Sequence, residues 1–500
     1  MSTPKPYRWP GRRARTVAVI IAAFVAFLAY GWLVFFHASF SAGGSDTSGY
    51  VNAARLMTTG RIVEPVAALR QLDLPDEFLR AFIPLGFVPG PKPRTMSPFH
   101  PPGFPLQVAL AGVIAGWNYG PFVVSPLAAL LSLLLIYSVA RELGLSRRFS
   151  AAGAAALALC PVFVFQAEQP MSEVSATMWS LAAVFCALRS RRRDAWALPA
   201  GAAFGMALLV RPADLLLLLP LLFALRLRIR TALFFAAAAA PFVAGLLAWN
   251  MAAYGSPFRT AYSEDLAQGL ALANFSGGLR HYGLWLVNLL SPLVPAGWLL
   301  VAADRRAAAR DRLLLLAWFA AFFLFSCFRG ASEAWWQTRF LLPGIPAMIL
   351  ASLLVVRDGL HVGKEDRGVF LRRAVTVLAL VAVVAVEYGQ IRGLGVLEVG
   401  EEEKVYADAS RWAEAKAPPG SLIVSMQMSG AIRYYTALAP VRWDRIEPEE
   451  ARVVRERARD QGRALYALLF PFEVERLRER LPGSWTRVGT LREVTLWRAD

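Results

Sequence analysis

A few ionisable residues stand beside long apolar runs, where a charged side chain is costly to place. Asp46 follows the first apolar run in SAGGSDTSGY, and Glu173 opens a later run in QPMSEV. Arg211 joins two short runs through the sequence RPAD, and Arg339 precedes another in WWQTRF. A carboxylate can act as a general base, and a guanidinium can form paired hydrogen bonds with a phosphate. These residue types would therefore suit an acid–base step beside a bound phosphate.

Each of these interpretations has a structural alternative. Asp46 could be the N-cap of the helix that begins with Asp-Thr-Ser, and the spacing alone favours that cap over a general base. Arg211 could pair with Asp214 and satisfy only a helix tip. The runs on either side of Arg211 are short enough, at about 22 Å each, to leave its guanidinium recessed at the depth of lipid phosphates.

Other candidates lie in the same exposed segments. Glu168 shares with Glu173 the connection QAEQPMSE between two apolar runs. His100 in SPFHPPGF could hydrogen-bond, act as an acid or base, or anchor a turn. Trp336 is an interfacial belt residue or a platform that stacks on a sugar. Tyr262, with its neighbours Glu264 and Asp265, lines an acceptor site or belongs to a solvated loop.

The elements that position these residues are membrane helices. Hydrophobic residues make up 56% of the 500 residues and charged residues 18%, which excludes a disordered chain and an ordinary soluble enzyme. The first apolar run follows a basic N-terminus and is too long for a signal peptide, so we expect an uncleaved anchor. Eleven apolar runs predict membrane helices. They cover Thr16–His37, Pro121–Ala140, Phe149–Gln166, Ser172–Leu188, Ala195–Val210, Ala213–Leu225, Thr231–Asn250, Gly283–Ala303, Leu313–Phe328, Phe340–Val356 and Ala374–Ile391.

The distribution of charge gives the orientation. The run Phe104–Gly116 is only about 20 Å long as a helix, so we expect it to lie on or dip into the outer leaflet. With that run left out of the spans, the Arg-rich short loops fall on one side and hold the whole net charge of +17, while the rest of the chain is balanced. This is the positive-inside pattern, so the basicity does not indicate nucleic-acid binding.

The chain divides into three parts. Residues 1–15 form a cytoplasmic N-terminus, and residues 16–391 form a transmembrane domain with a large first exoplasmic loop, 38–120. Residues 392–500 alternate strand-length apolar runs with charged helical stretches, which predicts an exoplasmic α/β domain with a largely parallel sheet. The expected strands are Leu422–Ser425, Ala464–Phe470, Trp485–Val488 and Val494–Trp497. The tail carries no Gly-rich phosphate loop, and all three cysteines fall in apolar runs, so neither a nucleotide site nor a disulfide framework is expected.

Several short motifs occur in an order that resembles one family of membrane enzymes. They are Asp46 with Tyr50, Ala53 and Leu56; Pro101, Pro102 and Pro105; Ser172 with Glu173; Arg211 with Pro212; Asn250 before Tyr254-Gly255-Ser256-Pro257; the run from Arg339 to Pro346; and Tyr434-Tyr435-Thr436. The chain resembles the GT-C class of glycosyltransferases, in particular bacterial relatives of protein O-mannosyltransferases and lipid A aminoarabinose transferases. The resembling mannosyltransferases have Asp-Glu in the first loop, where this chain has Asp46-Thr47.

The resemblance implies a GT-C-like polytopic α-helical fold and a site on the exoplasmic face of the bacterial inner membrane. It implies transfer of a sugar from a polyprenyl-phosphate donor to a cell-envelope acceptor, which is a lipid, a glycan or a protein. Asp46 would be the catalytic base. The expected substrate-binding residues are Tyr50, His100, Glu168, Glu173, Arg211, Tyr262, Trp336 and Arg339. The resemblance implies no definite cofactor and leaves a divalent metal open. The alternative function is a transporter or flippase of lipid-linked glycans.

Overall fold

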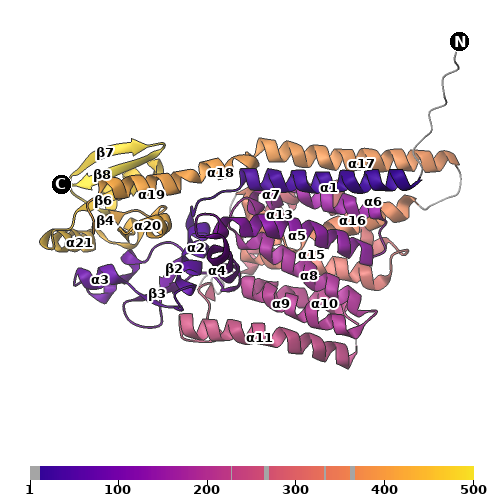
Figure 1. Cartoon of the computed structure of the whole chain (residues 1–500), viewed down its shortest axis with the longest axis horizontal. Coiled ribbons are helices and arrows are strands. Elements are labelled where there is room, and N and C mark those ends of the chain that lie inside the picture. Colours follow the sequence, from indigo (N-terminus) through magenta and orange to yellow (C-terminus); the bar gives the residue numbers. More distant parts are fainter. Residues whose placement is uncertain (1–11, 227, 264–269, 331–333, 361–365) are drawn as a thin grey trace, which may run out of the picture.

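The computed structural model describes residues 12–226, 228–263, 270–330, 334–360 and 366–500 (Figure 1). Most of these residues form a bundle of apolar helices. Its helices are α1 (Arg12–His37), α5 (Gly120–Glu142), α6 (Arg147–Leu159), α7 (Pro161–Ala167), α8 (Ser172–Ser190), α9 (Ala197–Val210), α10 (Leu218–Ala224), α11 (Ile229–Tyr254), α13 (Leu272–Leu290), α14 (Leu293–Leu300), α15 (Ala309–Arg329), α16 (Ile345–Leu360) and α17 (Asp366–Gly393). Short 3₁₀ turns complete it: η2 (Asp194–Trp196), η3 (Pro212–Leu217), η4 (Val301–Ala303) and η5 (Trp335–Leu341).

The bundle is that of a multi-pass membrane protein. In the described ranges, 4 helices are long and apolar enough to cross a membrane, or up to 7 if each strongly bent helix pair counts as one span. The eleven apolar runs are largely helical. Three of them contain apolar helices shorter than a full span, Ile21–His37, Asp194–Val210 and Pro212–Ala224, and Gly103–Ala115 is a fourth short helix outside the runs. The number of spans, eleven, stays a prediction.

Three of the expected spans contain a strong bend. Phe149–Gln166 bends by 65° between α6 and α7, Phe340–Val356 bends by 79° between η5 and α16, and Gly283–Ala303 bends most. The run Gly283–Ala303 was expected to be a single helix, but α13 begins earlier, at Leu272, and meets α14 at an angle of 111°. The break lies at Ser291, whose φ of 66° is left-handed, directly before Pro292. Proline disfavours a helical residue before it, so the Ser-Pro pair explains the break. The connection before this run is therefore shorter than the sequence suggests, because α11 extends to Tyr254 and α13 begins at Leu272.

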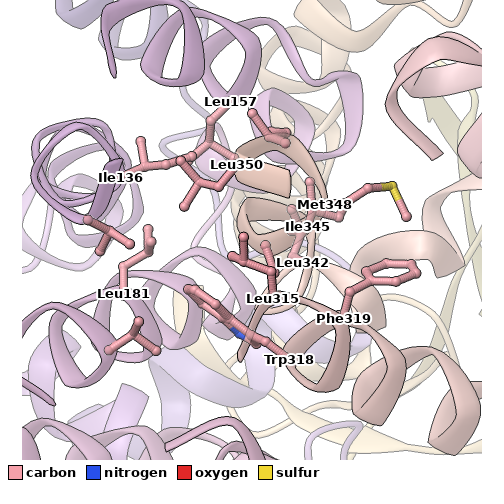
Figure 2. Close-up of a cluster of buried hydrophobic side chains, with 14 of the residues drawn as sticks. Ile136, Leu157, Leu181, Leu315, Trp318, Phe319, Leu342, Ile345, Met348 and Leu350 are labelled. Carbon is pink, nitrogen blue, oxygen red and sulfur yellow. The ribbon is translucent and has the colours of Figure 1, made fainter. Parts of the chain in front are cut away.

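Helices from distant parts of the sequence share one packed interior. Trp318 and Leu315 of α15 lie fully buried beside Leu342 and Met348, near the start of α16 (Figure 2). Side chains from α5, α6 and α8 close the same cluster. This interior fixes α8, η5 and α15 relative to one another, and these are elements that carry functional candidates. Cys160, Cys186 and Cys327 are buried, free thiols.

The first long loop caps one end of the bundle (Figure 1). It contains α2 (Ser45–Met57), β1 (Glu64–Pro65), α3 (Ala67–Gln71), η1 (Asp76–Phe82), β2 (Phe87–Pro89), β3 (Thr95–Pro98) and α4 (Gly103–Ala115). The three strands form a small antiparallel sheet in the order β1-β3-β2, which the Pro-rich sequence did not indicate. Helix α4 covers the short run expected to lie at the leaflet, and it leaves Leu110, Val113 and Ile114 exposed on one side.

The C-terminal part follows as an α/β unit beyond the first loop (Figure 1). Its elements are η6 (Val396–Glu398), α18 (Val399–Glu402), α19 (Lys404–Lys416), β4 (Leu422–Val424), α20 (Ser429–Tyr435), β5 (Ala439–Val441), η7 (Trp443–Arg445), α21 (Pro448–Asp460), β6 (Leu465–Leu469), α22 (Pro471–Arg480), β7 (Trp485–Leu491) and β8 (Val494–Ala499). The expectation of a largely parallel sheet is wrong, because the order β5-β4-β6-β8-β7 joins two parallel to two antiparallel pairings. A two-residue turn at Arg492 connects β7 to β8, and so short a connection allows only an antiparallel hairpin.

Candidate active site

Seven of the nine expected site residues meet around one point near the first loop, Tyr50 of α2 among them. Asp46 lies in the first turn of α2, and Glu173 lies in the first turn of α8. Arg211 links α9 to η3, and Arg339 belongs to η5. His100 precedes α4, and Tyr262 follows α11 at the edge of the described residues. Glu264 and Asp265 lie outside the described residues.

Asp46 is held by an arginine far away in the sequence. Arg339 Nη2 donates a hydrogen bond of 2.8 Å to Asp46 Oδ2 across 293 residues. Helix α2 begins instead with Gly44 as its N-cap, and no side chain caps that end. The N-cap interpretation of Asp46 is therefore wrong, and its carboxylate faces the site.

Glu173 is the buried anion of the site. Its Oε1 lies 3.0 Å from Arg211 Nη1 and 3.6 Å from Arg339 Nε, and its side chain is only 4% exposed. The position also suits a carboxylate because helix N-termini carry partial positive charge. No ion pair within the described residues joins Arg211 to Asp214, so the helix-tip pairing is wrong and Glu173 is the partner.

His100 is enclosed by aromatic rings. Its ring stacks on Tyr50, with centroids 3.9 Å apart, and its Nδ1 lies 3.2 Å from Tyr262 Oη. Its Nε2 points toward Asp46 Oδ1 at 3.9 Å. The close approach needs Gly49 of α2, because a Cβ there would stand 2.9 Å from His100 Nε2. Packing against Gly49, Tyr50 and Tyr262 therefore fixes His100 beside Asp46, in addition to charge.

Tyr50 connects this cluster to α8. Its hydroxyl donates a hydrogen bond of 2.8 Å to Ser172 Oγ, next to Glu173. Tyr50 is buried, and burial raises the pKa of its phenol well above the ordinary value, so it remains a neutral donor. Ser172 entered the sequence interpretation only as part of a motif, and its role as this link could not be read from spacing.

Two groups at the site have shifted pKa values with opposite causes. Burial raises the pKa of Asp46, but the charge and hydrogen bond of Arg339, together with smaller effects of His100 and Arg211, outweigh burial and hold that pKa below its usual range. Burial lowers the pKa of His100 to about 4, although Asp46 acts in the other direction. At neutral pH the site therefore contains an ionised Asp46 and an uncharged imidazole.

The cations outnumber the anions in this cluster. The guanidinium carbons of Arg211, Arg329 and Arg339 lie 5.4, 4.1 and 5.2 Å from the centre of the Phe340 ring. Arg211 Nη1 and Arg339 Nε are buried and face Glu173 Oε1 at 3.0 and 3.6 Å without forming an aligned hydrogen bond in the described structure. Three guanidinium groups beside these two carboxylates leave a surplus of positive charge that suits an anion. Arg329 was not among the expected site residues.

Two expected residues are not joined to this cluster. No hydrogen bond or ion pair among the described residues links Glu168 to it, and neither carboxylate oxygen of Glu168 has a hydrogen-bond partner. Burial raises the pKa of Glu168 to about 9, so it is a neutral acid. Trp336 is 45% exposed and packs edge-on against Trp335, which fits the belt alternative better than a platform in the site.

A divalent metal does not fit these donors. In the part of the chain that the structure describes, no three His, Cys, Asp or Glu side chains converge. Asp46 and Glu173 each contact a guanidinium, whose charge opposes a cation at the same place. We derive no step through a metal.

Part of the chain matches one known protein family, and its fold is similar to solved structures. The profile of a family described as dolichyl-phosphate-mannose-protein mannosyltransferase matches residues 99–251. No curated protein sequence matches the chain. The structure of ArnT from Cupriavidus metallidurans bound to undecaprenyl phosphate is similar, with a TM-score of 0.57 and 16% identity over 98% of both chains.

Two further solved structures agree. The apo state of the same ArnT gives a TM-score of 0.58 at 15% identity, over 97% of this chain and 98% of that chain. The archaeal oligosaccharyltransferase AglB from Archaeoglobus fulgidus, in complex with an inhibitory peptide and a dolichol-phosphate, gives 0.53 at 14% identity, over 91% of this chain and 70% of that chain. The chain therefore has the fold of the GT-C membrane glycosyltransferases, is similar to them along nearly its whole length, and is a multi-pass membrane protein.

Proposed function

We propose that this protein is an integral membrane glycosyltransferase that transfers a sugar from a polyprenyl-phosphate donor to a cell-envelope acceptor. One observation carries the proposal: the guanidinium groups of Arg211, Arg329 and Arg339 converge on Phe340 beside the carboxylates of Asp46 and Glu173, which leaves a surplus of positive charge. Guanidinium groups suit the phosphate of such a donor, because their planar donors match its oxygens. The likeness to structures that contain undecaprenyl phosphate or dolichol-phosphate supports this class of donor.

The proposed step is a displacement at the anomeric carbon of the sugar. An acceptor hydroxyl attacks that carbon while the bond from the carbon to the phosphate oxygen breaks, so the configuration inverts. The electron pair leaves with the polyprenyl phosphate, whose growing charge is stabilised by the arginines. The hydroxyl proton passes to Asp46, which is ionised and 31% exposed.

Arg339 has two tasks in this step. Before the donor binds, it is paired with Asp46 at 2.8 Å and keeps that carboxylate a weak base. A phosphate that attracts the same guanidinium would relax this pairing and raise the pKa of Asp46 toward its usual range. Donor binding would therefore activate the base, and Glu173 would keep Arg211 and Arg339 oriented during the exchange.

In this proposal the N-terminus is cytoplasmic and the site faces the exoplasmic side of the inner membrane. Residues 16–391 act as the transmembrane domain. Residues 392–500 act as an exoplasmic domain that packs against the first loop and covers the site. The positive-inside distribution of arginines supports this orientation.

The test uses the detergent-purified full chain and polyprenyl-phosphate mannose, the donor sugar in the matching family's description. Release of polyprenyl phosphate is measured for the wild type, Asp46→Asn, and Asp73→Asn, an exposed carboxylate on the same loop, as the matched control. Mass spectrometry of envelope lipids and glycans from cells with and without the gene identifies the sugar actually transferred. Equal envelope glycans in both strains, or movement of lipid-linked glycan across vesicles without cleavage, would contradict the proposal and favour the transporter alternative.

A further inference from the structure

A cavity lies between the first loop and the C-terminal unit, apart from the carboxylate site around Asp46. Its volume is about 400 Å³, which is within the range of small-molecule sites. Aromatic rings and two arginines line it: Phe40, Arg55, Trp117, Tyr119, Phe122, Arg411, Tyr434 and Tyr435, with Asn118. None of these residues belongs to the cluster around Asp46.

The two arginines, Arg55 and Arg411, form no ion pair with any residue that the structure describes. Arg55 lies 5.0 Å over the ring of Tyr434 and 5.8 Å from that of Trp117, and Arg411 lies 4.9 Å over Tyr435. Within the described ranges, no carboxylate comes within 4.0 Å of either guanidinium. Arg55 donates one hydrogen bond, of 3.0 Å, to the backbone carbonyl of Tyr434. The remaining guanidinium donors of both residues are available to a ligand that carries negative charge.

The walls of this cavity are fixed by contacts between separate parts of the chain. The backbone N–H of Ala42 donates to Tyr435 Oη at 2.7 Å, and Tyr434 Oη donates to the carbonyl of Trp117 at 3.1 Å. The two tyrosine rings pack edge-to-face, with centroids 4.8 Å apart. A preformed cavity loses less entropy when a ligand binds than one that must be ordered.

The cavity lies at the level where membrane helices begin and end. Phe40 follows the end of α1, and Tyr119 immediately precedes α5. Their ring centroids lie 6.0 Å apart, and the two residues are 40% and 65% exposed. Exposed aromatic side chains at helix ends are typical of the headgroup layer. Arg55 is also nine residues beyond Asp46 in α2, about 14 Å along the helix axis, so a ligand here would not occupy the carboxylate site.

We propose that this cavity binds the phosphate of an anionic lipid headgroup from the adjacent leaflet. Arg55 and Arg411 pair with the phosphate oxygens, the tyrosine rings hold both guanidinium groups in place, and Phe40 and Tyr119 meet the apolar part of the lipid. This binding site is independent of the chemistry proposed at Asp46.

The experiment measures binding of short-chain lipids to the delipidated full chain in detergent. The probes are dihexanoyl phosphatidic acid, dihexanoyl phosphatidylcholine and inorganic phosphate. Their binding is measured by native mass spectrometry or equilibrium dialysis. The variants are Arg55→Ala with Arg411→Ala, the matching double Lys variant, Asp46→Asn, and Arg230→Ala. Arg230 is the matched control, because its guanidinium lies 5.2 Å over Phe234 at the start of α11 and outside the cavity.

We expect saturable binding of phosphatidic acid, weakened about tenfold or more in the double Ala variant because two charge-assisted contacts are lost. The double Lys variant should recover part of the affinity, and binding should fall as salt is added. Asp46→Asn and Arg230→Ala should bind as the wild type does, even if Asp46→Asn abolishes sugar transfer. The proposal is overturned if phosphatidylcholine binds as tightly, if inorganic phosphate binds as tightly as phosphatidic acid, or if a correctly folded double Ala variant retains full affinity.

Discussion

Arg339 and Asp46 form an ion pair of 2.8 Å between η5 and α2. The carboxylate that we propose as the base is therefore neutralised by a cation that we also assign to the donor phosphate. The resting site is consequently poised, because neither residue can take on its proposed role until the pair separates. Several measurements follow from this arrangement.

Replacement of Arg339 should damage the transfer step more than binding. Removing one preorganised donor from a developing negative charge typically lowers kcat by about 10²–10³, and we expect this range for Arg339→Ala. Arg339→Lys should recover little, because an ammonium lacks the planar pair of donors. Steady-state kinetics on the purified protein measure the effect, with Arg70→Ala, an exposed arginine of the first loop, as the control. A variant without Arg339 that turns over at the wild-type rate would exclude this residue from the transition state.

The pH dependence should separate free protein from the donor complex. The pKa of Asp46 is lowered by Arg339, so kcat/KM, which reports the free protein, should stay level down to about pH 5. In the complex the phosphate competes for Arg339, the pKa of Asp46 rises, and the acid limb of kcat should lie at a higher pH. Profiles of both constants between pH 4.5 and about 8 measure this difference. Coincident acid limbs would contradict the exchange of partners.

His100 offers a rival base, and two variants distinguish it from Asp46. Its Nε2 is buried, has no hydrogen-bond partner in the described structure, and faces Asp46. If Asp46 takes the proton, Asp46→Asn should lower kcat by about 10²–10⁴, while His100→Gln, which keeps a polar side chain, should lower it far less. The reverse order of losses would transfer the role to the imidazole.

Stability should also depend on His100. Its pKa is about 4 in the folded chain and 6.5 in its ordinary state, so the unfolded chain binds the proton first. The contribution of neutral His100 is fully present above about pH 6.5 and is lost as the pH falls toward 4, by about 3 kcal/mol at most. The thermal midpoint in detergent should therefore fall between pH 7 and about pH 4.5, and fall less in His100→Gln. Equal drops in both proteins would show that His100 does not titrate in this window.

The contact of Gly49 with the first-loop sheet should tolerate no side chain. A Cβ at Gly49 would lie 2.8 Å from Gly86 Cα and 2.9 Å from His100 Nε2. Gly49→Ala should therefore cost about 1–3 kcal/mol and displace the imidazole, with loss of transfer activity. Gly245→Ala in α11 is the control, because nothing lies within 4 Å of its added Cβ and alanine favours helix. Thermal unfolding and activity measured on both variants test the difference.

The sequence could predict the kind of residue at the site but not its partners. Apolar runs located the helices, and the length of the runs beside Arg211 predicted a recessed guanidinium, whose depth in the membrane stays a prediction. The pairing of Arg211 with Glu173 and not with Asp214 could not be derived, because it depends on how α8 packs against α9. The role of Asp46 was ambiguous for a similar reason: in Gly44-Ser45-Asp46-Thr47 several residues are good caps, and only the fold selects Gly44.

The secondary structure that was missed has local physical causes. Strand β5 has three residues, Ala439–Val441, which are too few for an alternating pattern. The mixed sheet was foreseeable at the β7–β8 turn, where Arg492 and Glu493 leave no room for a crossover. The expected division into a transmembrane domain, a first loop and a tail after Arg392 stays a prediction.

The C-terminal unit packs directly against α2 and the residues that precede it. Tyr435 accepts a hydrogen bond from Ala42, Asn52 donates one of 2.8 Å to the carbonyl of Gly430, and a Cβ on Gly430 would stand 2.1 Å from Ser48 Oγ. These contacts hold the backbone on both sides of Asp46, so the position of the base depends on the position of the C-terminal unit. A chimera that exchanges only the tail with a distant relative would inherit a misaligned carboxylate, and compatible exchanges would have to carry the first loop along.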